Sequence, residues 1–146
     1  MKIAPDFKEF IACANDNEVR FLVVGGYAVA FHGHPRYTKN LDIWIERSSE
    51  NAQKVLKTLH DFGFESVQLT VDDFLEPDQV IQLGYPPLRI DILTTLSDVE
   101  FNDCYPNRQI LDIDGITMPV IGIEDLLVTK RAAGRHQDLA DVENLE

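Results

Sequence analysis

A short apolar run that ends in two glycines constrains the fold more than any other feature of the chain. Residues 19–26 read "VRFLVVGG", and such a β-branched, aromatic run predicts a buried strand that stops at Gly25 and Gly26. The next residues, "YAVAFHG", predict a short helix that ends at Gly33. A turn of this kind lets backbone approach a ligand phosphate closely, although it is also compatible with a purely structural role.

Two later segments predict strands that carry an acid on one face. In "NLDIWIE", residues 40–46, every second side chain is apolar, and the other face carries Asn40, Asp42, Trp44 and Glu46. In "LRIDILTTL", Asp91 shares a face with Arg89. If these strands are neighbours, Asp42 and Asp91 can share a hard divalent cation, which prefers oxygen ligands. The alternative is a solvated face on which both acids are exposed. Trp44 is expected to cover the sheet edge or to stack on a base.

The other elements follow from hydrophobic periodicity and from turn and cap residues. Helices are expected in residues 6–18, 50–62 (capped by Ser48 or Ser49) and 99–105, and two more on either side of Gly134; strands are expected in residues 80–84 and in a hairpin that turns at Asp114-Gly115. This order predicts an α+β (or α/β) fold with a mixed β-sheet flanked by helices, in a single domain over residues 1–146.

Composition narrows the function classes. The net charge is −12, so the surface repels a phosphate backbone, and long duplex nucleic acid is not an expected partner. Two cysteines form neither a disulfide framework nor a metal cluster, which suits a reducing compartment. No apolar run is long enough for a signal peptide or a membrane span, so we expect a cytoplasmic protein without membrane contact.

The spacing of these motifs resembles that of the polymerase-beta-type nucleotidyltransferases. Gly25-Gly26 is followed by thirteen residues, then by Asn40-Leu41-Asp42-Ile43, and later by a strand aspartate, Asp91. The segment "RYTKNLDIWI" is similar to the Arg-x-Thr-x-Asp-hydrophobic-Asp segment of small bacterial members, which include abortive-infection toxin-type transferases. The C-terminal "EDLLVTKRAAGRHQDLADVENL" also resembles theirs, and together the motifs span residues 20–145.

The resemblance implies a nucleoside triphosphate substrate and Mg²⁺ (or Mn²⁺) as cofactor. In that family a nucleoside monophosphate is moved to a hydroxyl acceptor by an in-line displacement. The residues that the resemblance assigns to catalysis and metal binding are Asp42 and Asp91. Those that it assigns to the nucleotide are Gly25, Gly26, Arg36, Thr38, Lys130 and Arg135.

Position 40 departs from the family pattern. A metal-bridging aspartate is expected there, whereas this chain has Asn40. An amide oxygen can still contact Mg²⁺, but it brings no charge and is a weak metal ligand. Three outcomes follow: slow catalysis, catalysis helped by another acid such as Glu46, or nucleotide binding without turnover.

Two further hypotheses stand beside a nucleotidyltransferase. The chain could be a catalytically impaired nucleotide-binding or partner-binding module, with Asn40 marking the lost chemistry, or a purely structural domain. For the enzyme, the acceptor hydroxyl could belong to a protein, an RNA or a small molecule. Assemblies compatible with such a chain are a homodimer and a complex with an antitoxin-type protein. A weaker metal hypothesis places zinc at His32 and His34.

Overall fold

The computed structural model describes residues 3–33, 39–64, 68–85 and 88–146. Its helices are α1 (Pro5–Asp16), α2 (Gly25–Phe31), α3 (Ser49–Phe62), α4 (Phe101–Cys104), α5 (Ile123–Ala133) and α6 (His136–Leu145). Its strands are β1 (Phe21–Val24), β2 (Asn40–Ile45), β3 (Val80–Tyr85), β4 (Leu88–Leu93), β5 (Gln109–Ile113) and β6 (Ile116–Val120). Short 3-10 turns cover Val71–Phe74 and Tyr105–Asn107, and neither was predicted from the sequence.

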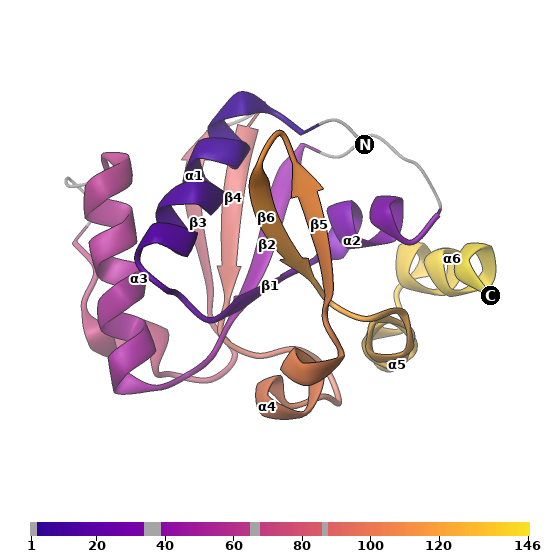
Figure 1. Cartoon of the computed structure of the whole chain (residues 1–146). Helices are drawn as coiled ribbons and strands as arrows, with labels where there is room; N and C mark the ends of the chain where they lie inside the picture. The colour runs from indigo at the N-terminus through magenta and orange to yellow at the C-terminus, as the bar shows by residue number, and fades with distance from the viewer. Residues whose placement is uncertain (1–2, 34–38, 65–67, 86–87) are drawn as a thin grey trace.

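The strands form one mixed sheet in the order β3-β4-β2-β1-β6-β5. Strands β2 and β4 are parallel, as are β1 and β6, and the other neighbours are antiparallel. Helices α1 and α3 lie on one side of this sheet, and α2, α5 and α6 lie on the other (Figure 1). The predicted α+β fold with a mixed sheet is confirmed, and the strand order is new information from the structure.

Local signals in the sequence explain where several elements begin and end. The Ser48 hydroxyl accepts a hydrogen bond from the Asn51 backbone N–H and so caps α3, and Gly63 ends that helix in the left-handed conformation. The β5–β6 hairpin turns through Asp114 and Gly115, both with positive φ, as the Asp-Gly pair predicts.

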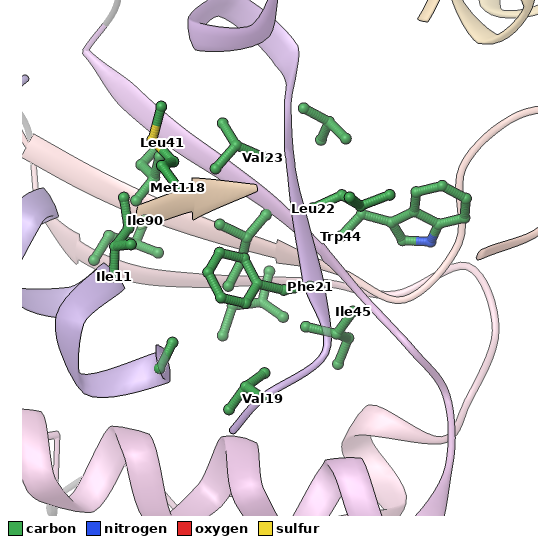
Figure 2. Packing of buried hydrophobic residues seen from close by; sticks show 14 of the residues in the cluster. Ile11, Val19, Phe21, Leu22, Val23, Leu41, Trp44, Ile45, Ile90 and Met118 are labelled. Carbon is green, nitrogen blue, oxygen red and sulfur yellow. The ribbon is translucent and has the colours of Figure 1, made fainter. Parts of the chain in front are cut away.

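The main hydrophobic core lies between the sheet and helices α1 and α3. The apolar stripe of α1 is fully buried, as its helical spacing predicts; it consists of Phe7, Phe10, Ile11 and Ala14. In Figure 2, Phe21 and Ile45 lie on the side of the sheet that faces α3. Burial of these side chains fixes which face of β1 and β2 points toward α1 and α3. The opposite face carries buried Leu22 and Trp44 at one end and the polar side chains of Asn40 and Asp42 at the other.

The outward face of β2 is covered over part of its length. Trp44 is 2% exposed, beside Leu22 and directed away from Phe21 (Figure 2). Its ring contacts Phe101 of α4 edge to face, with ring centroids 5.3 Å apart. The suggestion that Trp44 stacks on a base is therefore wrong, because α4 packs on this ring.

In the part of the chain that the structure describes, no helix combines the length and apolar character needed to cross a bilayer.

Candidate active site

A pocket of about 380 Å³ opens between the outward face of β2 and β4 and the helices α5 and α6. Its lining includes six of the residues that the sequence singled out: Gly25, Asn40, Asp42, Asp91, Lys130 and Arg135. They come from β2, β4, both C-terminal helices and the turn that follows β1, so residues far apart in the sequence meet in one place. Apolar side chains, including Leu93, Leu96 and Leu126, line another part of the pocket.

The pairing of β2 with β4 brings two carboxylates together. Asp42 lies directly opposite Asp91 in the parallel register, and the two strands are neighbours, as a shared cation requires. Asp91 is buried and Asp42 is partly buried. Burial first, and then the adjacent Asp91 carboxylate, raise the pKa of Asp42 to about 7, although Lys130 and Arg89 oppose the rise. Two carboxylates this close repel each other, and a bound cation would relieve that repulsion.

The raised pKa of Asp42 predicts a pH-dependent gain in stability for Asp42→Asn. An aspartate in the unfolded chain has a pKa of about 3.9, so between about pH 4 and 7 the folded chain binds more protons than the unfolded chain. The contribution of Asp42 to the free energy of unfolding therefore falls as pH rises through this range. Asn removes the effect, and we expect a gain of roughly 1–3 kcal/mol at pH 8 that shrinks toward zero near pH 4. Urea denaturation in chelator at both pH values measures it, and an equal difference at both would contradict it.

Gly25 leaves room for the side chain of Asp42. A Cβ built on Gly25 would lie 2.1 Å from Oδ2 of Asp42, which is far inside van der Waals contact. Gly25 also has a φ angle of +67°, which residues with a Cβ rarely adopt. The turn after β1 therefore requires glycine at this position so that the Asp42 carboxylate can lie against the backbone.

Lys130 of α5 is held by two acids of α6. Its Nζ lies 3.2 Å from Asp138 and 3.1 Å from Asp141, and all three residues are buried. Burial alone would raise the pKa of Asp138, but hydrogen bonds from Arg135 and Lys130 outweigh it and lower that pKa. The network fixes α5 against α6 and holds the lysine in the wall of the pocket.

Arg135 stands at the start of α6. Its backbone N–H and its Nε both donate to Asp138, the latter over 2.7 Å, and its side chain is largely exposed. The guanidinium is therefore at the mouth of the pocket, with one edge used by Asp138. Of the two predicted C-terminal cations, Arg135 is the accessible one and Lys130 is the buried one.

Sequence reasoning assigned no role to Arg89, although the strand pattern placed it on the face of Asp91. Its Nε and Nη2 donate to the two oxygens of Asp91 over 2.9 and 3.1 Å, in a bidentate pair. Arg89 also lies opposite Asn40 in the β2–β4 register. The alternation in "LRIDIL" was the available signal, since residues two apart on a strand share a face.

Other predicted residues lie elsewhere. Glu46, considered as a substitute acid, follows the far end of β2 and pairs with Arg20 over 2.8 Å, so it does not reach the Asp42–Asp91 pair. Gly26 is buried within α2 and is absent from the described pocket lining. Arg36 and Thr38 lie outside the described residues.

The donor set suits one hard cation better than two. Asp42 and Asp91 offer carboxylate oxygens, and Asn40 offers an amide oxygen, all of a type that Mg²⁺ or Mn²⁺ accepts. Among the described residues, however, no three His, Cys, Asp or Glu side chains gather closely enough to hold a metal, so the zinc hypothesis gains no support from His32. A divalent ion at this pair would need further ligands from a bound molecule, such as phosphate oxygens.

The mixed sheet, the strand–glycine–helix turn and the acid pair agree with the resemblance to the nucleotidyltransferases. The chain belongs to the family described as nucleotidyltransferases of unknown function (DUF6036), whose model matches residues 2–146. No curated protein matches the sequence closely enough to count as a relative.

Solved structures share the fold at low sequence identity. The Thermotoga maritima protein TM1012, assigned to the nucleotidyltransferases, has a TM-score of 0.62 at 16% identity, covering 98% of this chain and 94% of its own. The lincosamide antibiotic adenylyltransferase LnuA, bound to lincomycin, has a TM-score of 0.63 at 16% identity, and the match covers 98% of this chain and 96% of LnuA. An antigenic nucleotidyltransferase-like protein from Paracoccidioides brasiliensis has a TM-score of 0.54 at 17% identity, and the match covers 98% of this chain and 77% of that protein.

Proposed function

We propose that this chain transfers a nucleoside monophosphate from a nucleoside triphosphate to a hydroxyl acceptor, with Mg²⁺ or Mn²⁺ held by Asp42 and Asp91. The observation that carries the proposal is the register of β2 and β4, which sets these two acids side by side in a pocket that also contains Lys130 and Arg135. Acids for a metal and cations for phosphates are the two sets of groups that phosphoryl transfer needs.

Each group has a separate task in this proposal. Asp42 and Asp91 would hold the divalent ion, which would neutralise charge at the transferred phosphate. Arg135, exposed at the pocket mouth, binds the outer phosphates, and Lys130 supplies a fixed positive charge deeper in the wall. The apolar part of the pocket, with Leu93 and Leu126, receives the sugar and base.

Asn40 favours a second candidate function, a nucleotide-binding module with impaired turnover. It lines the pocket beside Asp42 and contributes an amide where the family pattern has a carboxylate. With one negative charge fewer, the site loses affinity mainly for a second divalent ion, because an amide does not bridge two cations as a carboxylate does. Both candidates require nucleotide binding and differ only in turnover.

The test is the melting temperature of the purified chain with ATP, GTP, CTP or UTP, each with and without Mg²⁺ or Mn²⁺. A ligand at 100 times its dissociation constant that binds only the folded chain adds about 2.7 kcal/mol to the free energy of unfolding. We expect a metal-dependent rise that Asp42→Asn and Asp91→Asn both abolish and that Asn40→Asp increases. Labelled nucleotide then separates the transferase from the binding module. No rise with any pair of nucleotide and metal would overturn both candidates.

A further inference from the structure

Four polar side chains form a square on the outward face of β2 and β4. The parallel register sets Asn40 opposite Arg89 and Asp42 opposite Asp91. Residues two apart along a strand share a face at about 6.7 Å, and neighbouring strands lie about 4.8 Å apart. The square therefore places one amide, two carboxylates and one guanidinium at neighbouring positions on one face of the sheet.

Arg89 already neutralises one corner of this square. Its bidentate contact uses both oxygens of Asp91 at 2.9 and 3.1 Å, with 29% of the Arg89 side chain and 10% of the Asp91 side chain exposed. Bidentate guanidinium–carboxylate pairs are strong, and low exposure strengthens them further because water screens them less. A divalent ion at Asp91 must therefore displace at least part of this contact or share the same oxygens with a cation.

Asn40 explains why Arg89 is committed to Asp91. The residue directly opposite the arginine is neutral, so the nearest carboxylate on the same face is that of its own strand. The formal charge of the four corners is −1, from two aspartates and one arginine. An empty site with this charge attracts a divalent cation more weakly than the two acids alone would.

We propose that Arg89 is a built-in competitor of the divalent cation at Asp91, which keeps metal affinity low until a nucleotide supplies further ligands. The inference rests on the metal role proposed for Asp42 and Asp91. Arg89 acts through its contact with Asp91 in this scheme. It favours binding of the metal together with the nucleotide over binding of the metal alone. On metal binding, the guanidinium gives up Asp91 oxygens and stays within reach of the incoming phosphates.

The test is Mn²⁺ binding without nucleotide, followed through the electron paramagnetic resonance signal of free Mn²⁺. Arg89→Gln is expected to bind Mn²⁺ about tenfold more tightly than the original chain, a change of about 1.4 kcal/mol in binding free energy. Arg89→Lys keeps the positive charge but cannot form the bidentate contact with Asp91, and we expect a smaller gain in Mn²⁺ affinity. Arg131→Gln is the matched control, because Arg131 is an exposed residue of α5 outside the pocket lining; the substitution removes one positive charge and should leave Mn²⁺ affinity unchanged.

The double variant Arg89→Gln/Asp91→Asn, compared with Asp91→Asn alone, shows whether the gain depends on Asp91, and we expect no gain in Mn²⁺ affinity between these two chains. Unchanged or weaker Mn²⁺ binding by folded Arg89→Gln, checked by circular dichroism, would overturn the inference, as would an equal gain in Arg131→Gln. Failure of this test leaves the proposed function standing if nucleotides still raise the melting temperature. If no nucleotide does so but Arg89→Gln gains affinity, the metal competition holds and the proposed function fails.

Discussion

Lys130→Met is expected to lower the free energy of unfolding by about 3–5 kcal/mol at pH 7, measured by urea denaturation. The Lys130 side chain is 10% exposed and its partners Asp138 and Asp141 are 2% and 0% exposed, so water does not replace the lost cation. Asp138 keeps its ion pair with Arg135, whereas the hydrogen bond that Gln137 donates to Asp141 comes from a neutral amide and brings no compensating charge. Methionine keeps most of the length of the lysine side chain and fills the space that it occupied. The loss of stability therefore reports the missing charge and not a packing defect.

Lys57→Met on α3 is the matched control for this substitution. Lys57 pairs with Asp61 at 2.9 Å over i,i+4, but its side chain is 65% exposed. Exposed pairs of this type contribute about 0.3–0.5 kcal/mol, so the expected loss is small. Equal losses for the two variants would show that the contacts of Lys130 with α6 do not stabilise the fold. Loss of nucleotide binding in a folded Lys130→Met chain would further support its place in the pocket wall.

The residues of this network were visible in the sequence, but their relationship was not. The resemblance of the C-terminal segment assigned Lys130 and Arg135 to the nucleotide, and the structure sets both in the pocket lining. Asp138 and Asp141 are eight and eleven residues beyond Lys130, across the helix break at Gly134. Contacts across such a break depend on the angle between α5 and α6, which helical periodicity within either segment does not determine.

The strands show the same division between local and tertiary information. Alternation of apolar and polar residues correctly predicted β2, β4 and the faces of Asp42 and Asp91, because the period of a strand is local. It did not predict the order β3-β4-β2-β1-β6-β5, since the same patterns fit several arrangements. Two consequences of tertiary structure were therefore missed: the pair of Arg89 with Asp91, and the burial of Trp44 beneath Phe101.

Gly25→Ala is expected to destabilise the chain by about 2–5 kcal/mol and to abolish metal-dependent nucleotide binding. The new methyl group would lie 2.1 Å from Oδ2, 2.9 Å from Cγ and 3.1 Å from Cβ of Asp42, so the whole acid side chain must move. Forced repacking of this kind costs about 1–3 kcal/mol, and the left-handed backbone adds about 1–2 kcal/mol for a residue with a Cβ. Because the displaced group is the proposed metal ligand, stability and binding should fail together. Urea denaturation measures the first and the nucleotide-dependent melting shift measures the second.

Gly134→Ala separates the cost of the clash from the cost of the backbone conformation. Gly134 has the same φ of +67°, but the new methyl group would lie 3.7 Å from the carbonyl oxygen of Arg131, which is an ordinary contact. It should lose only the backbone contribution, about 1–2 kcal/mol. The double variant Gly25→Ala/Asp42→Ala removes the carboxylate that clashes, so its loss should be smaller than the sum of the two single losses. If Gly25→Ala costs no more than Gly134→Ala, the backbone can shift to accept a methyl group, and Asp42 is not pressed against the turn. A larger cost that the double variant relieves would establish that glycine is required at position 25 because of Asp42.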